Sequence, residues 1–466
     1  MVTDRDHPSV EERVSRGSAA RADAPLASHG AWAPGAARTD PIDLLAEQAA
    51  ARVPELVPIR HGRMAVSPFT YYRGAALPMA ADLATTPSSG LVVQLCGDAH
   101  LSNFGMFGSP ERHLMFDVND FDETAPGPWE WDVKRLTASL EVAGREHQFP
   151  VHRRRAIVQS AVRAYREAMH RFARMAILDV WYAHLDTGDL LPRFRSLLDP
   201  EKTPSVWHAI SKARAHDSLH TFTKLCHSVD GKLRISPDPP LIIPLRDYVA
   251  DLDPHVVSHA LDEIFRSYLD TLEADRRQLL EHYRIVDAAR KVVGVGSVGT
   301  EAWIALLVDR AYAQPLFLQI KEADASVLER FTGTSPFPNH GQRVVSGQRL
   351  VQAASDIFLG WVRFGSRHGE RDYYLRQLHD WKGSADVAGM TAAGMELWGE
   401  MCGWTLARAH ARSGDRIAIA AYLGKSDAFD RAIADFSVAY GDQNERDFAM
   451  LQDALASGRL IAETGL

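Results

Sequence analysis

The sequence has few cysteines and no long apolar run. Its cysteines, Cys96, Cys226 and Cys402, lie far apart and form no CxxC pair. A disulfide framework and a zinc knuckle both need closely spaced cysteines, so neither is indicated, and a reducing, cytoplasmic location is expected. Nowhere do roughly 18 apolar residues follow one another, so we expect no membrane helix and no membrane partner.

A surplus of positive charge is lacking as well. Lysine and arginine total 52 against 60 aspartates and glutamates, which gives a formal net charge of -8. Without a long basic block the chain offers no track for a phosphate backbone, so nucleic acid is not an expected partner. Hydrophobic residues make up 46% and charged residues 24%, which predicts a folded protein with two or three lobes.

Sequence patterns divide the chain into four parts. Residues 1–40 lack a sustained period and the apolar core of a signal peptide, so they are expected to form a disordered leader. Helical spacing dominates 41–284 and returns in 383–466, while β-branched, glycine-punctuated runs fill 285–382. We predict an α+β fold in which a small antiparallel β lobe is inserted between two helical parts. The sequence does not indicate an oligomeric state.

One polar cluster follows an apolar strand pattern in VVQLCGDAHLSNFG, residues 92–105. Asp98, His100 and Asn103 stand close together directly after the strand. An aspartate at a loop mouth can orient a hydroxyl or accept its proton, and an asparagine offers a neutral oxygen to Mg²⁺. The alternative interpretation is an ordinary turn in which aspartate and asparagine cap backbone groups.

Further acids follow the next strand pattern. The apolar run Leu114 to Phe116 ends at Asp117, and Asp120, Asp122 and Glu123 crowd the same place. Mg²⁺ usually takes one or two carboxylates together with substrate phosphates. Asp117 and Asp120 are therefore candidate metal ligands beside Asn103.

A glycine-rich segment, GVGSVG, begins the second candidate site. Its glycines, Gly294, Gly296 and Gly299, form a GxGxxG pattern around Ser297. The following TEAWIALLVD alternates like a strand and does not open a helix, which disfavours a dinucleotide-binding crossover. A hairpin whose backbone covers phosphates is favoured.

One strand later, PLFLQIKEA places Lys321 in an apolar run. A lysine in a strand is commonly an edge residue that discourages aggregation. Its place one hairpin beyond a glycine loop favours a lysine that pairs with nucleotide phosphates.

Together these motifs resemble kinases of the aminoglycoside and choline phosphotransferase type. GDAHLSN resembles the catalytic loop, FDVND the metal-binding acid, GVGSVG the glycine loop and LQIKEA the lysine strand. The resemblance implies Asp98 as catalytic base, Asn103 and Asp117 as Mg²⁺ ligands, and Lys321 on the phosphates of ATP. Asp132 resembles the aspartate that anchors the loop from the following helix. After residue 40, nearly the whole chain also resembles a bacterial family of uncharacterised proteins.

The order of these motifs departs from that of a kinase. A kinase places the glycine loop and lysine before the catalytic loop, whereas here Asp98 precedes Gly294. LARAHARSGD, residues 406–415, resembles the helix that leads into a catalytic loop. A circularly permuted, two-lobed, protein-kinase-like fold reconciles both observations and brings the two sites into one cleft.

Two further departures concern single positions. Cys96 stands where the family usually has histidine, and His100 is a candidate to brace the loop instead. No glutamate partner for Lys321 is obvious, although Glu329 is close in sequence. Arg73, in YYRG, is a candidate for substrate binding or for ordinary packing.

The motifs favour an ATP- and Mg²⁺-dependent phosphotransferase whose acceptor is a small molecule. A nucleotide-binding pseudokinase is the main alternative, because Lys321 lacks an evident glutamate partner, and nucleotidyl transfer also remains open. A metallophosphoesterase is compatible with GDAH, but its later metal-binding blocks are missing. The pseudokinase predicts nucleotide affinity without turnover, and the phosphoesterase predicts two bound transition metals.

Overall fold

The computed structural model describes most of the chain. The described residues are 8–186, 222, 225–229, 231–292, 294, 296, 298–366, 369–378, 383–384 and 386–465. Helices combine with antiparallel strand ladders in a mixed α and β fold, as the sequence predicted. Within the described residues, no helix is both long and apolar enough to cross a lipid bilayer.

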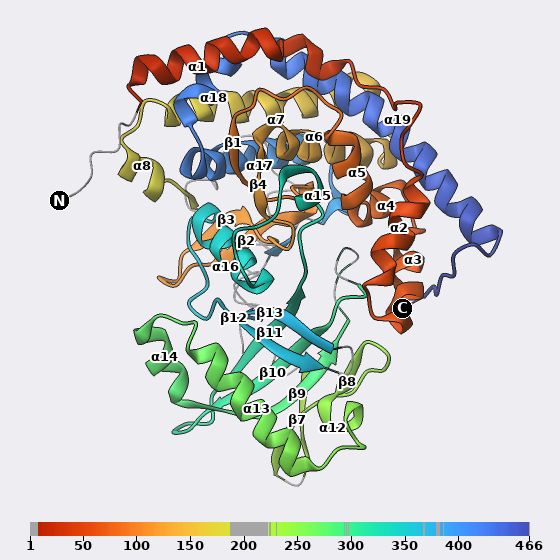
Figure 1. Ribbon diagram of the computed structural model, residues 1–466, viewed down its shortest axis with the longest axis vertical. Coiled ribbons are helices and arrows are strands. Elements are labelled where there is room, and N and C mark those ends of the chain that lie inside the picture. Colours follow the sequence, from red (N-terminus) through yellow and green to blue (C-terminus); the bar gives the residue numbers. More distant parts are fainter. Residues whose placement is uncertain are drawn as a thin grey trace.

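A six-stranded antiparallel sheet forms the lower part of the molecule in Figure 1. In spatial order its strands are β12 (Gly360–Ser366), β13 (Gly369–Gln377), β11 (Pro315–Ala323), β10 (Ala302–Asp309), β9 (Tyr283–Lys291) and β8 (Ile242–Pro244). Side chains alternate across a strand. Along β10, Trp303 and Leu307 therefore join one apolar cluster while Ile304 and Leu306 join another. Both faces are covered, which explains the unbroken apolar run of β10.

Different elements cover the two faces of this sheet. They are the helices α13 (Pro254–Leu269) and α14 (Ala274–Glu281) on one face and the hairpin of β6 (Cys226–Val229) and β7 (Lys232–Ile235) on the other. Tyr268 and Leu280 join the first apolar cluster and Ile235 the second. The predicted start of the β lobe at residue 285 is therefore wrong. An amphipathic pattern identifies a helix but does not show on which core it packs.

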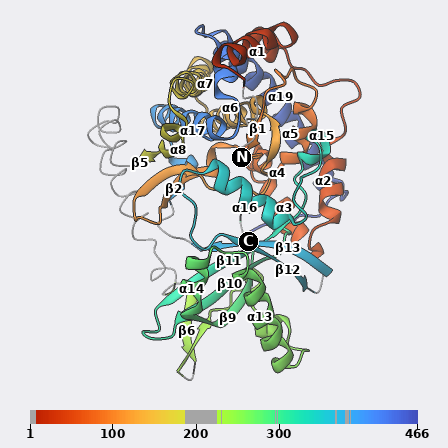
Figure 2. The same cartoon turned by 60° about the vertical axis from the view of Figure 1, so that its left-hand side comes forward.

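Helices form the upper part of the molecule (Figures 1 and 2). Its long helices are α1 (Val10–Asp23), α6 (Trp129–Glu146), α7 (Val151–Phe172), α17 (Ala392–Ser413) and α19 (Ala428–Ala456). At Gly403 of α17 an added Cβ would lie 2.2 Å from the carbonyl oxygen of Ala161 on α7. Only glycine allows this close crossing of the two helices. The helical spacing read from the sequence in 133–143 and 157–172 is confirmed by α6 and α7.

Shorter elements connect these parts. The helices are α2 (Pro41–Ala50), α3 (Val57–Met64), α4 (Pro68–Gly74), α5 (Ala76–Leu83), α8 (Ile177–Tyr182), α12 (Leu245–Tyr248), α15 (Glu329–Thr332), α16 (His340–Val351) and α18 (Arg416–Leu423). The 3-10 turns are η1 (Leu26–Gly30), η2 (Pro54–Leu56), η3 (Leu101–Asn103) and η5 (Val387–Gly389). α16 lies between the six-stranded sheet and the helical part in Figure 1.

Two small sheets hold the polar cluster at residues 98–103. One joins β1 (Val92–Leu95) to β4 (Ala125–Pro128), and the other has the order β14 (Gly383–Ser384), β2 (Phe104–Gly108), β3 (Leu114–Val118) and β5 (Leu185–Asp186). The loop between β1 and β2 carries η3. The strand patterns expected at residues 91–95 and 114–116 are confirmed by β1 and β3, whereas β2 lies between them and was not expected.

The expected disordered leader is wrong for residues 8–40. Ser9 and Glu12 form a capping box at the start of α1, and Arg13 pairs with Asp415 at 2.7 Å. Helix α1 lies along α18, where a Cβ on Gly17 would be 2.0 Å from a backbone oxygen of the neighbouring helix. Composition misled because α1 buries only small residues and therefore shows no apolar stripe. Residues 1–7 lie outside the described part.

Candidate functional site

The loop that carries Asp98 is fixed from behind by helix α6. The carboxylate of Asp132, in the first turn of α6, accepts the backbone N–H groups of Cys96 and Gly97 at 2.7 and 3.0 Å. His410 of α17 lies 3.2 Å from the same carboxylate. Asp132 therefore anchors the turn before Asp98.

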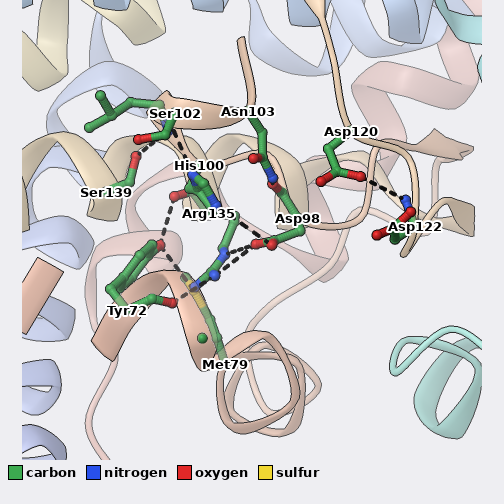
Figure 3. A network of polar contacts seen from close by, with 12 residues as sticks. Tyr72, Met79, Asp98, His100, Ser102, Asn103, Asp120, Asp122, Arg135 and Ser139 are labelled. Carbon is green, nitrogen blue, oxygen red and sulfur yellow. Dashed lines mark hydrogen bonds and ion pairs between the residues drawn. The ribbon is translucent and has the colours of Figure 1, made fainter. Parts of the chain in front are cut away.

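Arg135, also on α6, holds the side chain of Asp98. Its Nε and Nη2 atoms both lie 2.7 Å from Oδ1 of Asp98, and Nη2 also donates to the carbonyl oxygen of Tyr72 at 2.8 Å (Figure 3). Among the described residues, the other carboxylate oxygen faces His100 Nε2, at 3.7 Å. The Asp98 side chain is 18% exposed, so one oxygen is held in place while the group stays accessible.

His100, a predicted catalytic residue, is buried beside Asp98. The backbone N–H of Ser102 donates to its Nδ1 at 3.2 Å, which assigns the ring proton of the neutral form to Nε2, facing Asp98. Burial and the positive charges of Arg135 and Arg73 hold the pKa of His100 well below its usual range. The geometry therefore suits a brace for the loop.

Asn103 lies at the end of η3. Its Nδ2 donates to the backbone carbonyl of Asp98 at 2.8 Å, which orients the side-chain amide. Within the described residues its Oδ1 accepts no hydrogen bond, and the role of Asn103 as a magnesium ligand stays a prediction.

Asp117, the second predicted metal ligand, lies instead in the core. Its side chain is 1% exposed, and both carboxylate oxygens accept from Arg408 of α17, at 2.8 and 2.7 Å. The backbone N–H groups of Val118 and Ala353 complete the arrangement. Asp117 joins β3 to α17 and is not presented to a ligand. Its position at a strand end did not reveal toward which side of the sheet it points.

Asp120 and Asp122 are the acids that face the lysine strand. Lys321 Nζ lies 2.5 Å from Asp122 Oδ2 and 3.6 Å from Asp120 Oδ1. Burial alone raises the pKa of Asp122, but the charge and hydrogen bond of Lys321 outweigh it and hold the pKa below its usual range. Tyr374 on β13 donates a second hydrogen bond to Asp122, at 2.6 Å. Asp120 and Asp122 are 31% and 28% exposed, whereas Lys321 is 3% exposed.

The glycine segment joins two antiparallel strands, as predicted. It runs from β9 to β10, and Ala302 of β10 pairs with Lys321 of β11. Gly299 adopts φ +95°, and the backbone N–H of Val53 donates to its carbonyl oxygen at 2.7 Å. An added Cβ on Gly296 would lie 3.6 Å from the carbonyl oxygen of Arg73, while Gly294 has no neighbour within 4 Å of that position. Ser297 lies outside the described residues.

Glu329 does not pair with Lys321. Its Oε1 lies 3.5 Å from Nε of Arg343, and its carboxylate also accepts the backbone N–H groups of Ser326 and Ser335. The lysine has two aspartate partners in place of the glutamate expected from the resemblance.

Within the described residues, no group of three or more histidine, cysteine, aspartate or glutamate side chains is arranged to hold a metal ion. A two-metal phosphoesterase centre would need such a group. The donors that remain accessible, Asn103, Asp120 and Asp122, suit an ion that takes its other ligands from phosphates and water.

A comparison with protein families places the whole site in one conserved unit. The family model described as "Uncharacterized protein conserved in bacteria (DUF2252)" matches residues 52–454. The chain belongs to the DUF2252 family. No curated protein and no solved structure matches this DUF2252 chain. The matched region contains every candidate site residue, whereas α1 and α2 precede it.

Several residues of the DUF2252 site were not found from the sequence. They are Arg135, Tyr374 and Arg376, which surround the carboxylates of Asp98 and Asp122. A signal existed only for Arg135, since it stands one helical turn after Asp132 on the same helix and so beside the anchored loop.

Proposed function

We propose that the protein is an ATP- and Mg²⁺-dependent phosphotransferase that acts on a small-molecule acceptor. The observation that carries this proposal is the contact between Lys321 and Asp122, at 2.5 Å. It joins the strand after the glycine hairpin to the loop that follows β3, across almost two hundred residues of sequence. A lysine beside a metal-binding acid, next to a glycine loop, is the arrangement that kinases use for nucleotide phosphates.

The donor set fits a single magnesium ion. Asn103 Oδ1, Asp120 and Asp122 would hold it, with phosphate oxygens as further ligands. When bound, Mg²⁺ neutralises charge on the phosphates and orients them.

The side chains around Asp98 suit the proton transfer. The acceptor hydroxyl oxygen forms a bond to the γ-phosphorus of ATP, the bond from that phosphorus to the β,γ-bridging oxygen breaks, and ADP leaves. Asp98 takes the hydroxyl proton on Oδ2, while Arg135 holds Oδ1 at 2.7 Å. Lys321, once separated from Asp122, pairs with the phosphates.

The position of α17 supports a circular permutation. The Ser413 hydroxyl at its end accepts the backbone N–H of Gln94 on β1 at 3.2 Å. A Cβ on Gly414 would lie 3.0 Å from the carbonyl oxygen of Val92. The helix that resembles the one leading into a catalytic loop therefore ends beside the strand that carries this loop. A change in chain connectivity accounts for the unusual motif order without altering the proposed site.

The substitution Asp98→Asn tests the proposed chemistry. Asparagine keeps an oxygen for Arg135 but cannot take the proton, so transfer of ³²P from [γ-³²P]ATP to a small-molecule extract should fall at least about 100-fold. ATP affinity should stay at the wild-type value. Asp179→Asn, on α8, is the control and should leave transfer unchanged. Undiminished transfer in Asp98→Asn would refute the role of Asp98.

The same experiment separates the alternatives. A pseudokinase binds ATP and yields no labelled product, and a nucleotidyl transferase labels the acceptor from [α-³²P]ATP instead. The pseudokinase stays an alternative because Lys321 pairs with two aspartates and not with the glutamate that the kinase resemblance implies.

A further inference from the structure

Arg73 lies next to the proposed reaction centre and forms no ion pair with a carboxylate of the described residues. It stands in the last turn of α4, directly after Tyr72, whose carbonyl oxygen accepts from the same Arg135 that holds Asp98. Its Nε is buried and has no hydrogen-bond partner among the described residues. Burial lowers the pKa of Arg73, and the nearby charges of Asp98 and Asp120 offset part of this effect. The carboxylate oxygens of both acids lie farther from the Arg73 guanidinium nitrogens than the 4.0 Å that defines an ion pair.

Two more arginines of the α2–α4 segment share this property. Arg52 donates to the carbonyl oxygen of Val298 at 2.5 Å, beside the glycine segment, and its Nε has no partner in the described chain. Arg60 is 1% exposed, and its Nη2 donates to the side-chain oxygen of Gln48 and to the carbonyl oxygen of Gly74. Its Nε and Nη1 have no hydrogen-bond partner among the described residues. Neither forms an ion pair with a described carboxylate.

Even partial burial of a guanidinium ion is costly, and Arg60 is buried while Arg52 and Arg73 are half-buried. A buried charge without a partner destabilises a fold unless an opposite charge reaches it. The carboxylates at the centre are already engaged, Asp98 by Arg135 and Asp122 by Lys321. Arg73, which lies beside the centre, is therefore available to a ligand.

We propose that Arg73 binds an oxyanion group of the phosphoryl acceptor. The acceptor is then an anionic small molecule, either a phosphate monoester or a carboxylate, that also bears the reacting hydroxyl. This inference rests on the proposed function.

The acceptor is favoured over the nucleotide for two reasons. Arg73 directly follows Tyr72, whose carbonyl oxygen accepts from the arginine that holds Asp98, and its charge acts on Asp98 and His100 as well as on Asp120. Lys321 contacts Asp122 and Asp120, where the nucleotide phosphates are proposed to bind, and it acts on neither Asp98 nor His100 in the way that Arg73 does.

Calorimetric titration of inorganic phosphate tests the inference. The protein is first saturated with Mg²⁺ and the non-hydrolysable ATP analogue AMP-PNP, at constant ionic strength. Phosphate should bind this loaded wild-type protein, and Arg73→Gln should raise its Kd at least about tenfold, a loss typical of a charged hydrogen-bonding group. Arg63→Gln, on the adjacent helix α3, removes the same charge and should leave the Kd unchanged. The Kd of AMP-PNP should be equal in all three proteins.

The outcomes distinguish the two proposals. If loaded wild type binds no phosphate, or if Arg73→Gln weakens AMP-PNP instead, the acceptor site is overturned while the phosphotransferase stands. If wild type binds no AMP-PNP, the proposed function fails. Phosphate is then titrated into the protein without Mg²⁺ and AMP-PNP, which tests the oxyanion site by itself. If the free wild-type protein binds phosphate and Arg73→Gln weakens this binding, Arg73 still forms an oxyanion site. If the free wild-type protein binds no phosphate, the oxyanion site is overturned as well. If Arg73→Gln does not fold, Arg73→Lys keeps the charge, loses the two-pronged donor and should still weaken phosphate.

Discussion

At the scale of single residues, exposure separates the acids of the site into two groups. Asp98, Asp120 and Asp122 keep between 18% and 31% of their side chains exposed, whereas Asp117 keeps 1%. Ligand chemistry requires access, so only the first group can serve a substrate or a metal. Asp117 stabilises the packing of β3 against α17.

The first prediction concerns this division. Asp117→Asn leaves the Arg408 guanidinium buried without an opposite charge, so the free energy of unfolding should fall by about 3–5 kcal/mol in urea denaturation. Asp120→Asn should change this free energy far less and should weaken the dependence of ATP binding on Mg²⁺. A stable Asp117→Asn protein that no longer responds to Mg²⁺ would reverse the assignment.

Glu123 carries the second prediction, which concerns pH. Burial raises the pKa of Glu123 to about 7, against the opposing effect of Arg343 and of the hydrogen bond from the Val327 N–H. Between pH 4.5 and 7 the folded state therefore keeps a proton that the unfolded state has released. Raising the pH across this window should lower the free energy of unfolding by about 3 kcal/mol.

Glu123→Gln should remove this contribution. Burial of His29 and His100 lowers their pKa values and acts in the opposite direction, so the difference between wild type and Glu123→Gln is the quantity to measure. Urea denaturation at pH 5.5, 6.5 and 7.5 measures this difference in the free energy of unfolding. Glu111→Gln, at an exposed position, is the control. Equal pH slopes in wild type and Glu123→Gln would contradict the raised pKa.

At the scale of elements, the turn between β1 and η3 depends on a glycine. Gly97 adopts φ +90°, and an added Cβ would lie 2.0 Å from the carbonyl oxygen of Glu123. The turn thus brings the loop of Asp98 against the segment that carries Asp122. Gly90 also has a positive φ, +69°, but has no neighbour within 4 Å of the added Cβ.

The third prediction compares these two glycines. Gly90→Ala meets only backbone strain and should lower the free energy of unfolding by about 1–2 kcal/mol. Gly97→Ala adds a clash with backbone and should cost clearly more, with loss of ATP binding as the turn shifts. Thermal or urea unfolding of both variants measures the difference, and equal costs would show that the turn tolerates a side chain.

Sequence patterns predicted these elements where one apolar face decides the structure. The glycine hairpin, the lysine strand and the helices α6 and α7 followed from periodicity of 2 or 3.6 residues. The sequence could not predict α1, which packs through Gly17 and Ala20, nor the side of the sheet to which Asp117 points. Both features depend on a partner element that is distant in the chain. The partner of α1 lies about four hundred residues away, and the partner of Asp117 lies about three hundred residues away.

At the scale of the whole molecule, the β-rich and helical parts meet at Lys321. The acids after β3 and the lysine strand could each be recognised in the sequence. The ion pairs of Lys321 with Asp120 and Asp122 join these distant segments, so no local sequence pattern predicts them. The same holds for Arg135, whose role depends on how α6 crosses the loop of Asp98. The fold therefore brings two distant sequence regions together at Lys321.

The most direct test of this account is a calorimetric titration of Mg²⁺-ATP into wild type, Lys321→Met and the exposed control Lys425→Ala. We expect saturable binding by wild type and by Lys425→Ala, and at least about tenfold weaker binding by Lys321→Met, because a charge-assisted contact to phosphate is lost. Circular dichroism would confirm that each variant is folded. Absence of saturable binding by wild type, or equal affinity in Lys321→Met, would contradict the proposed nucleotide site.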